Sequence, residues 1–128
     1  MGYTIERDGD VLLLVVDGTW TPEVAFQLQE EAAKEIKRHG LRGLLVDLRR
    51  AEHGKVSTID IYEVTVSHET VFPSSTRHAV LYDPKRFSRS DAVFYENVAA
   101  NRGLKAAVFT DRDEAIVWLR SEKKPPSS

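Results

Sequence analysis

The sequence predicts an α/β protein with a mixed, mostly parallel β-sheet, an antiparallel N-terminal hairpin and about four flanking helices. Three short, almost continuously apolar runs support this prediction, because a strand buried on both faces of a sheet has no polar side. Segments with helical signals separate the runs, as the crossovers between parallel strands require. The apolar runs are GLLVDL (43–48), RHAVLYD (77–83) and LKAAVFTD (104–111).

The N-terminal part of the chain predicts a hairpin followed by a helix. The residues DGD at 8–10 form a turn signal between two short apolar runs, which is typical of a β-hairpin. In the next segment Thr21 is the predicted N-cap, Pro22 the first helical residue and Gly40 the stop. The apolar residues between them share one broad arc, so this helix is expected to lie on the sheet.

Three more helices complete the predicted order β-β-α-β-α-β-α-β-α. One has Ser88 or Ser90 as its cap and Gly103 as its stop, and another has Asp111 as its cap with a glutamate three residues later. The segment STIDIYEVTVSHE at 57–69 is ambiguous, because its Ile and Val content favours a strand. It connects two buried strands, however, and such a crossover is usually helical, so we predict a helix.

Length and composition limit the classes of function. A chain of 128 residues is one domain by default, and we expect a single domain over 1–121 with a disordered tail, EKKPPSS, at 122–128. Cysteine is absent, which excludes disulfides, thiolate metal sites and thiol catalysis. The formal net charge of −2 gives no general attraction for nucleic acid. Without a signal-peptide pattern or an apolar run that could span a membrane, a cytoplasmic protein is expected.

The segment HGKVSTID at 53–60 most resembles a chemical site. A phosphate-binding loop requires G-x-x-x-x-G-K-[ST] directly after a strand. Here a valine follows the Gly-Lys pair, and Arg49 stands where the first glycine of the motif should be. We therefore disfavour a nucleotide site and predict that Ser57 or Thr58 caps a helix.

Charged residues gather where the predicted parallel strands end. Asp47, Asp83 and Asp111 each close a strand, but the acidic pair and terminal lysine of a phospho-receiver are missing, so we interpret these acids as structural. Several arginines share this edge and either balance the acids or, with the helix N-termini, bind a small anion or lipid headgroup. They are Arg49, Arg50, Arg86, Arg89 and Arg112.

The histidines predict neither a metal site nor a catalytic triad. His39, His53, His68 and His78 lack the spacing of a zinc motif. A triad of His53 with a nearby serine and aspartate would have no nucleophile elbow beside it, so a hydrolase is the least favoured hypothesis. We expect no cofactor, no metal and no enzymatic activity.

Some apolar residues have no obvious place in a core. In EAIVWLR at 114–120 they point nearly all round the expected helix, and this surplus favours a partner surface or a pocket. Trp118 in that helix, Trp20 before the first helix and Phe72 in an exposed loop are the candidates for such contacts. They favour a homodimer or a hydrophobic ligand cavity.

The element order and the segments LRGLLVDLR, ENVAANRGLKAAVFTD and DEAIVWL resemble STAS-type proteins related to sporulation anti-anti-sigma factors. More narrowly, they resemble a stand-alone bacterial group described as having a STAS and CRAL-TRIO-like fold. The resemblance implies a small α/β domain that acts through binding, with a serine phosphorylated by a partner kinase at the position of Ser57 or Thr58. The Asp-Ser-(Ser/Thr)-Gly motif of the family is missing here. CRAL-TRIO relatives imply instead an apolar ligand under the helices.

The sequence therefore predicts a non-catalytic, homodimeric binding module with a regulatory protein or kinase as its partner. Its expected interaction or anion-binding region consists of Arg49, Arg50, Ser57, Thr58 and Arg86, and Ser57 and Thr58 are the candidate phosphorylation sites. The alternative is a carrier or sensor of a small apolar or anionic ligand resembling a lipid.

Overall fold

A computed structural model describes residues 2–54 and 56–121. Within them the predicted elements occur in the predicted order, with two short strands added. The elements are β1 Tyr3–Asp8, β2 Val11–Val16, β3 Thr19–Trp20, α1 Pro22–His39, β4 Gly43–Asp47, β5 Glu52–His53, α2 Thr58–Val71, β6 Arg77–Leu81, α3 Arg89–Asn101, β7 Lys105–Phe109 and α4 Arg112–Leu119. The tail predicted at 122–128 and Lys55 of the Gly-Lys pair lie outside the described residues.

The main sheet has the mixed arrangement that the sequence predicts. Its strand order is β1-β2-β4-β6-β7, in which β1 and β2 are antiparallel and the other neighbours are parallel. Asp8 pairs with Val11, so the hairpin turn contains only two residues, and Gly9 takes a φ of 62° there. A positive φ is far less costly for glycine than for other residues, which explains why this turn has one.

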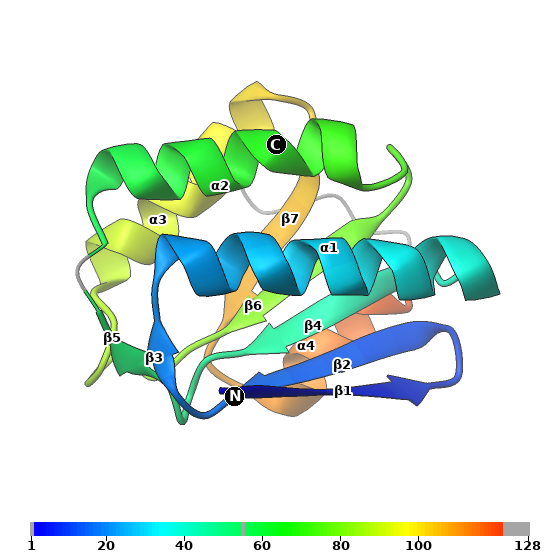
Figure 1. Ribbon diagram of the computed structural model, residues 1–128, viewed down its shortest axis with the longest axis horizontal. Helices are drawn as coiled ribbons and strands as arrows, with labels where there is room; N and C mark the ends of the chain where they lie inside the picture. The colour runs from blue at the N-terminus through cyan, green and yellow to red at the C-terminus, as the bar shows by residue number, and fades with distance from the viewer. Residues whose placement is uncertain (1, 55, 122–128) are drawn as a thin grey trace.

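Helices cover both faces of this sheet. Helices α1, α2 and α3 lie over one face, and α4 lies against the other (Figure 1). Side chains alternate accordingly along β4: Leu44 packs in the cluster that includes α1, whereas Leu45 packs with residues of α4. The α/β fold class with helices on both faces is therefore confirmed. No helix in the described part of the chain is long and apolar enough to cross a membrane.

The predicted helix ends are confirmed in detail. The hydroxyl of Thr21 accepts a hydrogen bond from the backbone N–H of Val24 at 3.2 Å, and Gly40 ends α1 with a φ of 60°. Ser88, rather than Ser90, caps α3. The ambiguous segment is helical, as its crossover position required, although its apolar residues are spread around the helix axis.

A small parallel pair of strands, β3 and β5, was not expected from the sequence. Glu52 of β5 lies opposite Thr19, and the backbone N–H of Gly54 donates to the carbonyl oxygen of Trp20 at 3.1 Å. A Cβ atom on Gly54 would lie 2.8 Å from that same oxygen, closer than side chains approach a backbone. The glycine of the segment HGKVSTID therefore lets the loop after β4 pack against the chain that enters α1.

Candidate functional site

The N-terminus of α2 presents an ordered hydroxyl at the surface. The Oγ of Ser57 accepts from the backbone N–H of Asp60 at 3.1 Å, and the Asp60 carboxylate accepts from the backbone N–H of Ser57 at 3.0 Å. These two bonds form a capping box, so Ser57 is the cap and Thr58 is the first helical residue. Beside them, Ile59 is 68% exposed and Tyr62 is 44% exposed. The start of α2 therefore combines an exposed serine with exposed apolar side chains.

Arg49, one of the arginines predicted to share this region, is paired with a buried aspartate. The guanidinium of Arg49 makes two hydrogen bonds, of 3.1 Å and 3.0 Å, to the buried carboxylate of Asp47. The hydrogen bond to Asp47 raises the pKa of Arg49, and the nearby carboxylate of Asp111, the cap of α4, raises it further. Arg49 therefore lies toward the face that α4 covers and balances the acids there, whereas Ser57 begins a helix on the other face. Arg50 and Arg86 are exposed.

The His-Ser-Asp combination considered in the sequence does not form a proton relay. The ring of His53 stacks on Phe87 with 4.8 Å between centroids, and the hydroxyl of Ser57 is used in the capping box with Asp60. Two other histidines do come together. The rings of His68 in α2 and His78 in β6 stack with 4.4 Å between centroids and 8° between planes.

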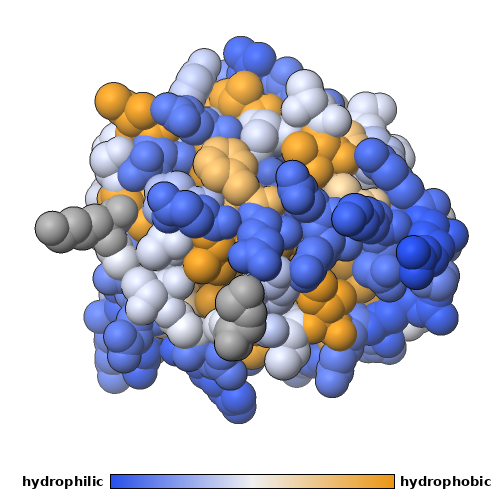
Figure 2. Space-filling view, viewed as in Figure 1, coloured by the Kyte–Doolittle hydropathy of each residue, from blue (hydrophilic) through white to orange (hydrophobic). Residues whose placement is uncertain are grey.

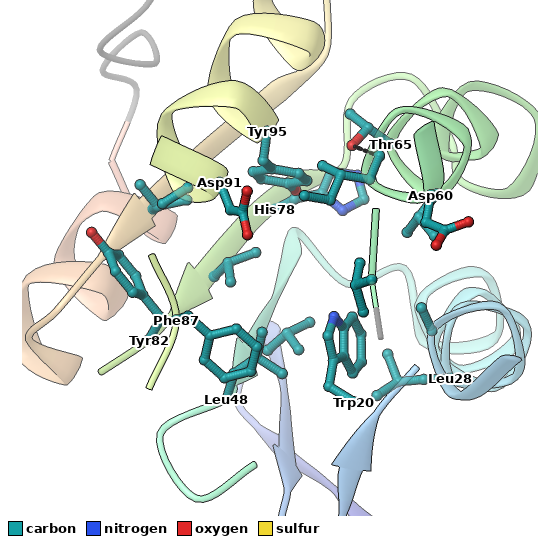
Figure 3. A pocket seen from close by; sticks show the side chains of 18 of the residues that line it. Trp20, Leu28, Leu48, Asp60, Thr65, His78, Tyr82, Phe87, Asp91 and Tyr95 are labelled. Carbon is teal, nitrogen blue, oxygen red and sulfur yellow. Dashed lines mark hydrogen bonds between the residues drawn. The ribbon is translucent and has the colours of Figure 1, made fainter. Parts of the chain in front are cut away.

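A cavity of about 130 Å³ lies between the sheet and the helices α1, α2 and α3. Most of its lining is apolar and comes from strands β4 and β6 and from all three helices. Figure 3 shows Trp20, Leu48 and Phe87 across the hollow from Tyr95 and His78. Trp20 thus lines a pocket, which was one of the two alternatives for it. Phe72 also lines this cavity, in agreement with the pocket alternative, but it is only 5% exposed, so the expectation that it lies in an exposed loop is wrong.

A hydrogen-bonded polar group forms the inner end of the cavity. The hydroxyl of Ser67 lies 2.7 Å from Oε1 of Gln29 and 2.6 Å from the carbonyl oxygen of Val64, and its single proton is within reach of both acceptors. The Nε2 of Gln29 donates to the Val64 carbonyl oxygen and to Nδ1 of His68, at 3.0 Å and 3.1 Å. The remaining proton of a neutral His68 is then on Nε2, which lies 3.4 Å from the Tyr95 hydroxyl.

Burial controls the charge of these side chains. Desolvation lowers the pKa of His68 to about 4, and it lowers the pKa of His78 well below its usual value, with a further contribution from His68. Desolvation also raises the pKa of Tyr95. All three groups are therefore uncharged at neutral pH, so the inner end of the cavity offers neutral donors and acceptors.

The structure corrects the expectation that Trp118 belongs to a dimer surface or a pocket. Trp118 is 7% exposed and packs in the core on the α4 face, where the Arg77 guanidinium carbon lies 4.0 Å from the centre of its ring. Helix α4 contacts β4, β6 and β7, and this packing uses more of its apolar residues than a helix resting on one strand would. Val117 is the large apolar side chain that α4 leaves exposed, at 65%.

Comparison with known proteins gives no match to a family description and no match to a curated protein. Solved structures do share the fold. An anti-sigma factor antagonist from Mycobacterium paratuberculosis is 14% identical, with a TM-score of 0.63 over 93% of each chain. An uncharacterized protein from Shewanella loihica with a SpoIIAA-like fold is 19% identical, with a TM-score of 0.51 over 91% of each chain. A variant of RsbS from Moorella thermoacetica is 15% identical, with a TM-score of 0.54 over 92% of this chain and 94% of that one.

These likenesses define the class of fold. The chain has the fold of STAS domains, as its sequence predicts, with the mixed sheet and the helix that starts after the central strand. Sequence reasoning located the start of that helix correctly. It did not find the paired histidines or the polar inner end of the cavity, because these residues are far apart in the sequence and carry no spacing signal.

Proposed function

We propose that this chain is a non-catalytic regulatory module that binds a protein partner through the N-terminal half of α2. The observation that carries the proposal is the exposure of Ile59 and Tyr62, at 68% and 44%, beside the ordered hydroxyl of Ser57. Residues three apart on a helix are neighbours, so these two side chains form one continuous apolar surface. One protein with the same fold is named as an antagonist of an anti-sigma factor, and antagonism of that kind acts on a protein.

The surface has the composition of a protein contact. Tyrosine is enriched among the residues that dominate binding energy at interfaces, and an isoleucine in the first turn of a helix gains nothing from such exposure in water. Apolar side chains also interrupt the otherwise hydrophilic surface of this side of the molecule (Figure 2). A partner that covers Ile59 and Tyr62 would remove them from water without displacing the capping box.

We also propose Ser57 or Thr58 as the place where modification would regulate this contact. A phosphate on Ser57 carries about two negative charges. It would place them close to the Asp60 carboxylate, which accepts a hydrogen bond from the backbone N–H of Ser57. The amides at the start of α2 favour such charge and the carboxylate opposes it, so the capping box would have to rearrange. Arg50 and Arg86 remain proposed contacts for an anionic partner.

Affinity capture from the host cell, followed by quantitative mass spectrometry, tests the partner surface. Three forms of the full chain are compared: the unchanged chain, a double variant Ile59→Ser with Tyr62→Ser, and a control Val117→Ser. The control removes a side chain of similar exposure, 65%, from the opposite face. We expect the unchanged chain and the control to capture the same proteins in similar amounts. With the double variant, the recovered amount of these proteins should be at least about tenfold lower. Equal recovery with all three forms, or none above background, would reject the proposal.

The predicted homodimer and the cytoplasmic location are separate parts of the proposal. Light scattering of the concentrated protein tests the first, and a monomer would remove it without affecting the partner surface on α2. Fractionation of the host cell tests the second.

A further inference from the structure

One imidazole on the wall of the cavity has no hydrogen-bond partner in the part of the chain that the structure describes. His78 is 4% exposed, and among the described residues neither of its ring nitrogens makes a hydrogen bond. Its contacts are with other rings: it stacks on His68, and Phe72 meets it edge-on at 4.8 Å between centroids. Its ring nitrogens are not among the fully buried side-chain atoms that lack a partner, so they reach the open space of the cavity. Polar groups inside proteins are nearly always hydrogen-bonded to protein or to ordered water, so this imidazole leaves a donor and an acceptor available to an occupant. A group inside the cavity would satisfy it.

The size and lining of the cavity define what could enter. Its volume of about 130 Å³ is close to that of engineered cavities of about 150 Å³ that bind benzene. Trp20, Leu48 and Phe87 provide a largely apolar wall across the hollow from His78 (Figure 3). The space therefore suits one six-membered ring or a branched hydrocarbon of similar size.

Charge in the cavity selects against ions. Asp60 and Asp91, from the first turns of α2 and α3, line the cavity and would repel an anion. The same two carboxylates would attract a cation, but a cation would have to leave water for a mostly apolar space in which the imidazole of His78 is neutral, and that desolvation is costly. A neutral imidazole offers one N–H donor and one bare nitrogen acceptor, which is what a hydroxyl group needs.

We propose that the cavity under α1, α2 and α3 binds one uncharged, ring-sized molecule whose hydroxyl group forms a hydrogen bond with the imidazole of His78. The ring occupies the space beside Trp20, Leu48 and Phe87, and the hydroxyl points toward the strand β6. This site does not depend on the protein-binding surface of α2. It makes the chain a receptor for a phenol-like or alicyclic alcohol, whatever partner it has.

Phenol and toluene are suitable probes, because they have nearly the same shape and differ only in the hydroxyl. Their dissociation constants are measured by NMR titration of the full chain, with amide and histidine side-chain nitrogen signals observed. We expect saturable shifts for both probes at residues of the cavity. Phenol should move the ring nitrogen signals of His78 more than toluene does. In a His78→Leu variant, the ratio of toluene to phenol dissociation constants should fall about fivefold, as expected for one hydrogen bond.

A second pair of variants tests the location without changing His78. Ala92 of α3 lines the cavity, so the larger side chain of Ala92→Leu should fill part of it. The dissociation constants of both probes should then rise at least about tenfold. Ala100 lies on the same helix at a similar, half-buried level and away from the cavity lining, and Ala100→Leu should leave both affinities unchanged. The proposal is overturned if neither probe saturates, if Ala92→Leu has no effect, or if toluene and phenol move the His78 signals equally. In the last case the imidazole is satisfied by water alone.

Discussion

The buried histidines predict that acid destabilises this protein before its carboxylates are protonated. Burial holds the pKa of His68 at about 4 in the folded chain, against 6.5 when the side chain is exposed. Because the folded pKa is the lower of the two, the unfolded chain binds the proton more tightly. The stability that depends on a neutral His68 is therefore complete above pH 6.5 and is lost as the pH falls toward 4.

The size of this loss follows from the difference between the two pKa values. That difference corresponds to about 3 kcal/mol when the pH is well below 4, and to about 2 kcal/mol between pH 7 and pH 5. His78 adds a loss of the same sign, because its pKa is also lowered well below 6.5. For a urea slope of about 2 kcal/mol per molar, the unfolding midpoint falls by about 1 M or more between pH 7 and pH 5.

Urea unfolding followed by circular dichroism at several pH values between 7 and 5 measures this effect. A His68→Gln variant should lose a large part of the pH dependence, whatever its stability at pH 7. A His39→Gln variant is the control, because this ring lies near the surface, 3.7 Å from Glu35. If the free energy of unfolding of the unchanged protein varied by less than about 0.5 kcal/mol over this range, the assignment of two buried neutral imidazoles would be wrong.

Three further predictions concern the packing around the site, and each is tested by urea unfolding at pH 7. Ser57→Ala removes the hydroxyl that accepts from the backbone N–H of Asp60, and should lower the free energy of unfolding by about 1 kcal/mol. Ser57→Asp and Thr58→Ala should lower it much less. Arg49→Ala leaves the buried Asp47 carboxylate without its two guanidinium bonds and should cost about 1–3 kcal/mol, while an unchanged midpoint would show that water replaces them. Gly54→Ala places a Cβ 2.8 Å from a backbone oxygen, so it should destabilise the chain by about 1 kcal/mol or more, and a stabilising effect would contradict the close approach.

The sequence was sufficient for the order of the main sheet's strands and the four helices, because local signals and burial agreed along most of the chain. The capping residues of α1 and the apolar runs of the central strands each point to one structure. The segment at 57–69 is the exception, since its β-branched residues favour a strand while the connection between β4 and β6 requires a helix. The connection prevails, because the capping box stabilises the first turn and both neighbouring strands are fixed in the sheet.

The candidate site was less predictable because its parts meet only in three dimensions. His68 and His78 are ten positions apart in the sequence, with no spacing that suggests a pair, yet their rings stack. Trp118 was misassigned for a related reason. Helical periodicity cannot show that α4 packs against three strands, and this packing buries a side chain that appeared to be in excess.

Asp60 links the two proposals. Its carboxylate accepts the backbone hydrogen bond of Ser57 at the start of α2, and its side chain also lines the cavity. A phosphate on Ser57 that repelled this carboxylate would therefore change the cavity wall, and a molecule in the cavity would in turn act on the helix that carries Ile59 and Tyr62. Coupling between two binding sites is reciprocal in free energy. A change in the phenol affinity of the chain after phosphorylation of Ser57 would thus equal, in free energy, the effect of phenol on that phosphorylation equilibrium.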